Sequence, residues 1–348
     1  MEILFVGDVN RHTRGFQRLA VFRQLGHNVI VVPEFCIRGK GIDESKSSYF
    51  VKLMWKLGFP LDEACANTKI RDILHKGQDI NLVWIEKGNT IYPSTLRLIK
   101  RIIPHVPLAS FSEDDMYAWH NRSFYYTWGL KHYDIIFTTK TYNLTELKKL
   151  GGRRTELVLD SFDEALHRPV SLSEKEKKEY ETDVGFIGTF ENDRAEQMLF
   201  LAENGIKVEI YGNEWDAWLF RHPNLIVHNT PIYNEEYVKK INATKINLCF
   251  LRKMNRDAVT SRSVEIPACG SFMLAERTER HKDFFKEGEE AEFFGSREEL
   301  LEKIRYYLTH TDERQKIAER GRKRCFDGGY SNRDQLARAL FFINSINI

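Results

Sequence analysis

EILFVG, residues 2–7, is the stretch that decides the fold, because this short apolar run ends in glycine just before a helical pattern. Apolar residues between Phe16 and Leu25 recur at the spacing of one helix face. Gly26 ends that helix, and NVIVVPE at residues 28–34 supplies a second β-branched run. Two apolar strands joined by a helix form a parallel βαβ unit, so the chain is predicted to open like a Rossmann fold.

The same alternation of strands and helices recurs along the chain. Further strand-like runs lie at residues 81–89, 106–111, 133–140, 155–162, 183–190, 207–212, 224–229, 245–251 and 270–276. This pattern is typical of α/β proteins with mostly parallel sheets. We predict two Rossmann-like domains, at 1–165 and 183–330, joined by a charged, solvated linker at 166–182. Residues 331–348 have helical spacing, which leaves open whether this C-terminal helix crosses back to the N-terminal domain.

The composition excludes several classes of protein. The length of 348 residues corresponds to about two domains. The 52 Lys and Arg nearly balance the 50 Asp and Glu, so no nucleic-acid partner is predicted. The five cysteines are scattered without CxxC spacing, which argues against a disulfide framework and a zinc site. Because no apolar run is long enough for a signal peptide or a membrane span, we expect a cytoplasmic protein without a transmembrane segment, and peripheral membrane association is left open.

Two segments of the second domain could bind a phosphate-bearing ligand, because ligands of open parallel sheets bind beyond the carboxyl ends of the strands. In the first, GFIGTFENDRAEQM, a strand runs through Gly188 into a helix, and Arg194 could bind phosphate there. The alternative is that Asn192 caps this helix and Arg194 faces solvent.

The second segment, residues 251–270, holds four basic residues in otherwise apolar surroundings, among them Arg252 and Arg262. Glu265 follows Arg262 by three residues, and its carboxylate could accept hydrogen bonds from the hydroxyls of a ribose. The alternative, a structural ion pair between Arg262 and Glu265, remains open.

In the first domain, SEDD at residues 112–115 follows a predicted strand. Its acidic residues could supply a base or bind sugar hydroxyls, or Ser112 or Asp114 could cap a helix instead. We expect Gly7, Lys87, Asn89 and Asp115, which also lie at predicted strand ends, to line the acceptor side of the same crevice.

Several motifs are absent from the sequence. It contains no GxGxxG after the first strand, no GxxxxGK[ST], no HExxH, no GxSxG, and no histidines at metal-ligand spacing. We therefore predict neither a bound cofactor nor a metal site, and an oxidoreductase is disfavoured.

The chain resembles the CgeB-like (spore maturation protein) glycosyltransferases, which are related to the group 1 glycosyltransferases. The resemblance rests on RKMNRDAVTSRSVEIPACGSFMLAERTERHKDFF (252–285), EGEEAEFF (287–294), FIGTFENDRAEQM (186–198), WIEKGN (84–89) and SFSEDD (110–115). It implies the GT-B architecture of two Rossmann-like domains facing a central cleft, with a nucleotide-sugar donor held mainly by the second domain.

The resemblance also implies roles for single residues. Group 1 relatives carry an E-x7-E motif whose second Glu binds the donor ribose; Glu265 occupies that position here, and Asp257 stands in place of the first Glu. Basic residues bind the diphosphate in relatives, and Arg194, Arg252 and Arg262 match them. Where relatives often have a His-Asp pair, this chain has Glu113 and Asp114, and His120 is a further catalytic candidate.

We therefore predict a metal-independent, retaining glycosyltransferase of the hexosyltransferase type. It would transfer a sugar from a nucleotide diphosphate sugar to a hydroxyl of a glycan, lipid or protein acceptor. Two alternatives remain open: a nucleotide-sugar epimerase of the same fold, and a non-catalytic nucleotide- or sugar-binding protein.

Overall fold

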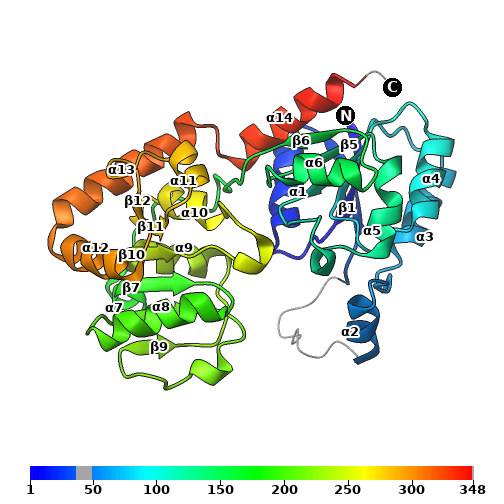
Figure 1. Cartoon of the computed structure of the whole chain (residues 1–348). Helices are drawn as coiled ribbons and strands as arrows, with labels where there is room; N and C mark the ends of the chain where they lie inside the picture. Colours follow the sequence, from blue (N-terminus) through cyan, green and yellow to red (C-terminus); the bar gives the residue numbers. More distant parts are fainter. Residues whose placement is uncertain (37–48, 347–348) are drawn as a thin grey trace. The chain divides into compact units, whose positions relative to one another are not determined.

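The chain divides into two compact units, which the computed structural model describes over residues 1–36 and 49–346 (Figure 1). Unit 1 comprises Met1–Leu159 and Asn332–Ile348, and unit 2 comprises Asp160–Ser331. Each unit holds a six-stranded sheet in which every strand pair is parallel. The predicted α/β class with two Rossmann-like domains is thereby confirmed.

Unit 1 has the strand order β2-β1-β3-β4-β5-β6. Its strands are β1 (Glu2–Gly7), β2 (Asn28–Pro33), β3 (Leu82–Glu86), β4 (Leu108–Ser112), β5 (Ile135–Thr138) and β6 (Thr155–Leu157). Its helices are α1 (Arg14–Gln24), α2 (Tyr49–Lys56), α3 (Ala66–His75), α4 (Pro93–Ile102), η2 (Trp119–Asn121), α5 (Phe124–Gly129), η3 (Leu130–His132), α6 (Asn143–Lys149) and α14 (Asn332–Asn344).

Alternation along the strands gives the sheet of unit 1 two apolar faces. Leu4 and Val6 of β1 belong to a core cluster shared with α3 and α4. Ile3 and Phe5 point the other way, into a cluster with α1 and α14. Helices therefore cover both faces (Figure 1), as a parallel sheet requires, because both of its faces are apolar.

Unit 2 has the strand order β12-β11-β10-β7-β8-β9. Its strands are β7 (Thr182–Ile187), β8 (Val208–Tyr211), β9 (Leu225–Val227), β10 (Thr244–Cys249), β11 (Met273–Glu276) and β12 (Glu292–Phe294). Its helices are α7 (Glu174–Tyr180), α8 (Asn192–Glu203), η4 (Asp216–Trp218), α9 (Asn234–Ala243), η5 (Lys253–Asn255), α10 (Arg262–Ala268), α11 (Glu279–Phe284), α12 (Arg297–Thr309) and α13 (Thr311–Asp327).

The core of unit 2 follows the same rule. Ile246 and Leu248 of β10 lie in a cluster with α8 and α12 on one face of the sheet. On the other face, the Asn247 side chain donates a hydrogen bond to the carbonyl oxygen of Ile241 in α9, 3.2 Å away. α10 packs beside β10 and β11 on that face, and α13 packs against α10.

The structure differs from the sequence prediction at three places. Residues 160–165, which we predicted at the end of the first domain, belong to unit 2 by contact. The predicted linker 166–182 also belongs to unit 2; it contains α7, which Ser173 and Glu176 begin with a capping box, and the first residue of β7. β12 was not predicted, because its three residues follow an acidic stretch without alternation.

The C-terminal helix α14 belongs to unit 1 and packs against α1. Residues 347–348 of the predicted segment 331–348 lie outside the described residues.

Candidate functional site

Two arginines lie close to one aromatic ring at the carboxyl edge of the unit 2 sheet. The guanidinium carbons of Arg194 and Arg262 lie 5.5 and 6.0 Å from the centroid of Phe186, which belongs to β7. Arg194 is only 3% exposed. The interpretation of Arg194 as a solvated surface residue is therefore wrong, since the packing of α8 buries it.

This arginine pair has unused hydrogen-bonding capacity. The Nε atoms of Arg194 and Arg262 are buried and have no hydrogen-bond partner within the part of the chain that the structure describes. Burial, and then the charge of Arg262, lowers the pKa of the Arg194 guanidinium. The group nevertheless stays protonated, as arginine side chains do in proteins. A buried guanidinium next to a partly buried one, each with an Nε unpaired among the described residues, forms a pair of cations that an anion would stabilise.

Gly188, which directly follows β7, allows this approach because it has no side chain. A Cβ at this position would lie 2.6 Å from Phe186 Cζ and 3.4 Å from Nη1 of Arg194. Any larger residue would therefore displace the Phe186 ring, near which both guanidinium groups lie.

Two carboxylates hold the loop that follows β10 against this edge. Glu191 accepts hydrogen bonds from Arg194 (2.9 Å), from Nε of Arg252 (3.1 Å) and from the backbone N–H of Lys253 (3.2 Å). Glu276, at the end of β11, accepts from the backbone N–H of Leu251 at 3.0 Å and pairs with the Lys253 ammonium. Glu191, and not Asn192, is the N-cap residue of α8, and it makes no side-chain cap bond. Its carboxylate is therefore available to bind the basic side chains.

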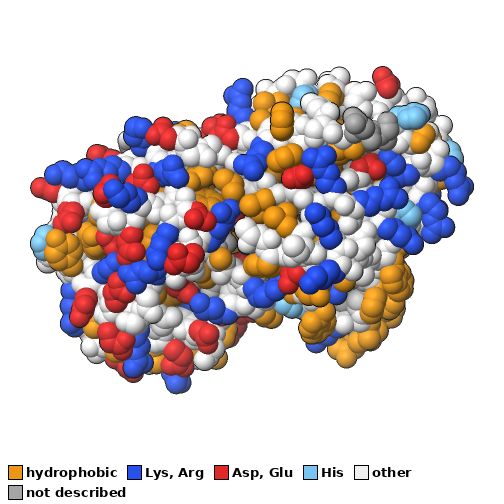
Figure 2. Space-filling view, turned by 45° about the horizontal axis from the view of Figure 1, so that its top comes forward, with side chains coloured by type: hydrophobic (Ala, Val, Ile, Leu, Met, Phe, Trp, Pro, Cys, Tyr) orange, Lys and Arg blue, Asp and Glu red, His pale blue; other side chains and the backbone are white. Residues whose placement is uncertain are grey.

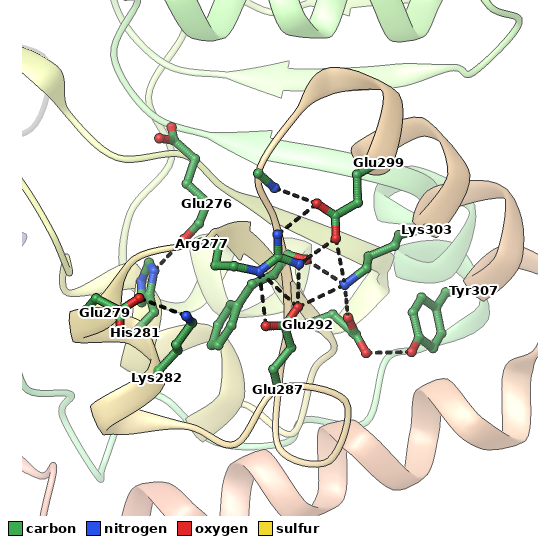
Figure 3. A network of polar contacts seen from close by, with 12 residues as sticks. Glu276, Arg277, Glu279, His281, Lys282, Glu287, Glu292, Glu299, Lys303 and Tyr307 are labelled. Atoms are coloured by element: carbon green, nitrogen blue, oxygen red, sulfur yellow. Dashed lines mark hydrogen bonds and ion pairs between the residues drawn. The ribbon is translucent and has the colours of Figure 1, made fainter.

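A polar network next to Glu276 fixes the end of β11 (Figure 3). Arg277 donates to Glu287 at 3.1 Å and to Glu299 at 2.8 Å, so it joins the end of β11 to α12. Lys303 of α12 in turn donates to Glu292 of β12 at 2.5 Å. Networks of this kind hold their members more firmly than isolated surface pairs do.

A buried serine–histidine pair positions α10. Nδ1 of His281 donates to the carbonyl oxygen of Glu276 at 2.7 Å, which leaves Nε2 to accept the hydroxyl proton of Ser263 at 2.7 Å. Burial lowers the pKa of His281 to about 4, so the ring is neutral at physiological pH. Both side chains are fully buried. The pair therefore fixes the start of α10, the helix that presents Arg262 and Glu265.

Glu265 lies one turn after Arg262 in α10 and is held by two residues that the sequence did not indicate. The Tyr237 hydroxyl of α9 donates to its Oε2 at 2.7 Å. Nε2 of His167 lies 3.9 Å from its Oε1. The backbone N–H of Asp163 donates to Nδ1 of His167, which places the imidazole proton on Nε2, toward the carboxylate. Burial and then the Glu265 charge raise the pKa of Tyr237 well above its ordinary value, so this hydroxyl remains a donor.

The remaining predicted donor-side residue, Asp257, lies in the turn after η5. Its carboxylate accepts a hydrogen bond from the Asn255 side chain at 2.8 Å. Arg252 is half exposed, whereas Arg194 is buried. The structure thus brings Gly188, Arg194 and Arg262 together around Phe186, and links Arg252 to them through Glu191.

In unit 1, Glu113 follows β4 and is bound by two arginines of α1. Arg14 and Arg18 reach its Oε1 at 3.1 and 2.8 Å. Burial alone would raise the pKa of Glu113, but the two guanidinium groups lower it to about 2. Glu113 is therefore a carboxylate at neutral pH, and it cannot act as a general acid there.

Asp114 pairs with the Lys87 ammonium. The Lys87 side chain is half exposed, and that of Asp114 is partly exposed. Burial would raise the pKa of Asp114, yet Lys87 outweighs this effect and lowers it. This ion pair is the most accessible charged group among the predicted acceptor-side residues.

Two other predicted acceptor-side residues hold the backbone in place. Asn89 is buried and binds residues 121–123: its side chain donates to the Asn121 carbonyl at 3.0 Å and accepts from the Ser123 N–H at 2.8 Å. Asp115 is fully buried and accepts from the Asn143 side chain at 2.8 Å. The sequence predicts that both face ligand. The structure buries both in tertiary contacts, which no local sequence pattern indicates.

Gly7 and His120 complete the predicted set in unit 1. A Cβ at Gly7 would lie 2.7 Å from the Cβ of Glu86, so glycine is needed for the end of β3 to pack beside β1. Glu86 is buried and accepts from Nε of Arg18 and Nε1 of Trp84, both at 2.8 Å. His120 lines a small cavity with Trp55.

Sequence reasoning missed the binding partners of the predicted residues. These partners are Glu191, Tyr237, His167, Arg14 and Arg18. Sequence reasoning also missed three carboxylates that bind neighbouring residues, Glu276, Glu86 and Glu34. One signal was present: Arg18 interrupts the apolar face of α1, and a buried cation needs a carboxylate nearby. Glu34, which follows β2, accepts from the N–H and hydroxyl of Thr90, both at 3.0 Å, and burial raises its pKa to about 7.

Among residues 1–36 and 49–346, no three His, Cys, Asp or Glu side chains are grouped closely enough to hold a metal ion. No helix over the same residues is both long and apolar enough to span a membrane.

Residues 194–340 match the model of a family described as glycosyl transferase-like. No curated protein matches the sequence of this chain.

The fold itself is similar to that of several solved structures. HepE from Anabaena, in complex with UDP, has a TM-score of 0.63 and 13% identity over 98% of this chain and 100% of that chain. Sucrose-phosphate synthase from Thermosynechococcus elongatus has a TM-score of 0.66 and 10% identity, with coverage of 99% and 98%. A Listeria monocytogenes protein assigned as a UDP-N-acetylglucosamine 2-epimerase has a TM-score of 0.56 and 11% identity, with coverage of 98% and 94%. The fold is therefore that of the GT-B glycosyltransferases.

Proposed function

We propose that this chain is a glycosyltransferase, of the CgeB-like group, that transfers a sugar from a nucleotide diphosphate sugar to an acceptor hydroxyl. The observation that carries the proposal is the arginine pair, in which both Nε atoms are buried without a partner in the described part of the chain and Arg262 lies one helical turn from Glu265. Two further findings support it: the glycosyl transferase-like family model covers these residues, and HepE is a structure in complex with UDP.

In this proposal, Arg194 and Arg262 bind the donor diphosphate. Arg252, which is half exposed and paired with Glu191, also contacts it. Their positive charge stabilises the departing nucleoside diphosphate as negative charge develops on it, so that no metal ion is needed. Glu265, oriented by Tyr237, accepts hydrogen bonds from the ribose hydroxyls.

On the acceptor side, Asp114 is the proposed base or sugar-binding carboxylate, because it is partly exposed while Glu113 is bound by two arginines. Release of Asp114 from Lys87 would leave a carboxylate able to accept the hydroxyl proton. We propose that transfer retains the anomeric configuration, as the resemblance to the group 1 glycosyltransferases implies. The acceptor is a glycan, lipid or protein, and the reaction takes place in the cytoplasm.

A nucleotide-sugar epimerase is the second candidate, because one of the similar folds is assigned to a UDP-N-acetylglucosamine 2-epimerase. An epimerase would convert the sugar without joining it to an acceptor. The two activities therefore differ in their products.

A two-step experiment tests the proposal. First, melting temperatures are measured with a panel of nucleoside diphosphates and nucleotide sugars, because a ligand that binds only the folded state raises the melting temperature. Second, the stabilising nucleotide sugar is incubated with candidate acceptors and the products are analysed. Glycoside formation with release of nucleoside diphosphate is expected. A sugar with one inverted carbon that is not joined to an acceptor would indicate the epimerase. Saturable binding without turnover would refute both enzymatic functions.

A further inference from the structure

An aromatic and aliphatic surface lies on unit 1, on α2 and on the segment after β4 that Asn89 and Asp115 bind. α2 contains no buried residue, although most of its side chains are apolar. The segment from η2 to α5 adds three exposed aromatic rings. We call these residues the aromatic surface: Tyr49, Phe50, Leu53, Trp55, Leu57, Trp119, Phe124 and Trp128. In Figure 2, hydrophobic side chains gather at the part of unit 1 that holds α2.

The members of this surface are in contact through the turn after α2. The backbone N–H of Phe124 donates to the carbonyl oxygen of Gly58 at 2.8 Å. The Phe124 ring stacks on Phe59, with centroids 4.9 Å apart, and on Trp128 at 5.5 Å. Trp55 and Trp119 line the same cavity of about 160 Å³. The two segments therefore form one continuous surface.

The two segments that carry this surface hold basic but no acidic side chains, although Asp62 and Glu63 follow the first segment directly. Residues 49–60 and 116–133 contain four Lys and Arg and not a single Asp or Glu. Over the whole chain, by contrast, 52 basic residues nearly balance 50 acidic ones. Lys56 is exposed and lines the cavity together with Arg122. A partner that fits must therefore be apolar in part and negatively charged.

We propose that the aromatic surface docks unit 1 on an anionic lipid bilayer. Indole and phenol rings are stable at the depth of the lipid headgroups, and nearby Lys and Arg bind the lipid phosphates. Leu53 and Leu57 favour a bilayer over a glycan, because aliphatic side chains fit acyl chains but do not stack on sugar rings. The one-sided charge favours a bilayer over a second copy of this chain, since two copies would bring like charges together.

The tryptophans offer a direct test. Three of the six lie in the aromatic surface, and the other three, Trp84, Trp215 and Trp218, are buried. The full-length protein is mixed with phosphatidylcholine vesicles that contain about 30% phosphatidylglycerol, and with vesicles of phosphatidylcholine alone. We expect co-sedimentation with the anionic vesicles that weakens with salt, a blue shift of the emission, and quenching when the acyl chains are brominated.

Matched variants locate the binding surface. Leu57→Ser with Trp119→Ser, and separately Lys56→Glu, are each expected to weaken binding to anionic vesicles about tenfold or more. Phe220→Ser and Lys316→Glu are the controls, because these side chains are also exposed but belong to unit 2. Unchanged melting temperatures and unchanged nucleotide binding would show that each variant is folded. Nucleotide binding also separates this test from that of the proposed function, because it does not require the aromatic surface.

Three results would overturn the proposal. One is the absence of binding to anionic vesicles, and another is binding that the surface variants leave unchanged. The third is self-association, or quenching by soluble oligosaccharides, that depends on the aromatic surface while vesicles have no effect.

Discussion

Replacing Arg194 by methionine should remove most of the affinity for a nucleoside diphosphate while unit 2 stays folded. Methionine preserves much of the apolar contact with Phe186 but supplies no charge and no hydrogen-bond donor. The variant therefore separates the two functions of this side chain, packing and anion binding.

The size of the effect follows from the contacts of the guanidinium group. A hydrogen bond to a charged group contributes about 1.5–3 kcal/mol, and a buried guanidinium can donate two to a diphosphate. Allowing for the bond to Glu191 that must loosen, we expect a loss of about 3 kcal/mol, or roughly a hundredfold in Kd. The stability of unit 2 should change by no more than about 1 kcal/mol. Desolvation and repulsion from Arg262 already offset what the Glu191 pair contributes.

Isothermal titration calorimetry with the nucleoside diphosphate that gives the largest thermal shift measures this loss, and urea denaturation measures stability. Arg297→Met is the matched control. The guanidinium carbon of Arg297 also lies over a phenyl ring, 4.6 Å from the centroid of Phe200, but Arg297 is the first residue of α12 and does not belong to the proposed donor site. Its affinity should equal that of the unaltered protein. The reasoning fails if Arg194→Met binds within about twofold of the unaltered chain, since charge-assisted bonds could not then be present.

Three further predictions concern single carboxyl groups. Glu265→Gln should weaken binding of nucleoside diphosphates about tenfold but leave inorganic pyrophosphate unaffected, because a ribose acceptor is lost; calorimetry with equal losses for both ligands would contradict this role. Glu34→Gln should raise the melting temperature at pH 8.5 and have little effect at pH 5. With its pKa raised to about 7, folded Glu34 holds a proton that the unfolded chain loses near 4.5, so its stability contribution falls as pH rises between these values; equal shifts at both pH values would count against this. Glu113→Gln should reduce stability at pH 7 by about 2 kcal/mol. That difference should shrink as pH falls from 4.5 toward 2, where the native carboxylate is protonated, and urea titrations with a constant difference would exclude the arginine contacts as its cause.

The sheet strands could be predicted well because their signal is local. Residues 2–7 form β1 as expected, since an apolar run ending in glycine is sufficient to indicate a buried parallel strand. β12 escaped prediction for the opposite reason. Glu292 opens this three-residue strand and is buried, because Lys303 and the Tyr307 hydroxyl bind its carboxylate. A charged residue in a buried strand depends on partners supplied by another helix.

The site residues show the same division. The position of Arg194 just inside α8 could be predicted, but its burial could not, because Phe186 of the neighbouring strand encloses it. The acidic run at 112–115 was predicted as one group facing ligand. The structure separates its members: Glu113 binds α1, Asp114 binds Lys87, and Asp115 is buried. These partners lie far away in the sequence, so no spacing rule reveals them.

The position of α14 in unit 1 has a consequence for biosynthesis. The chain leaves unit 1 after Leu159 and returns at Asn332, so a ribosome completes unit 2 before it makes the helix that covers α1. Leu336 and Ile343 complete a core that contains Phe5. At about 5–20 residues per second, the nascent N-terminal unit therefore waits roughly ten to thirty seconds with one face of its sheet incompletely covered. Unit 2 is continuous and can fold during that interval, whereas unit 1 depends on α14, which is synthesised after unit 2.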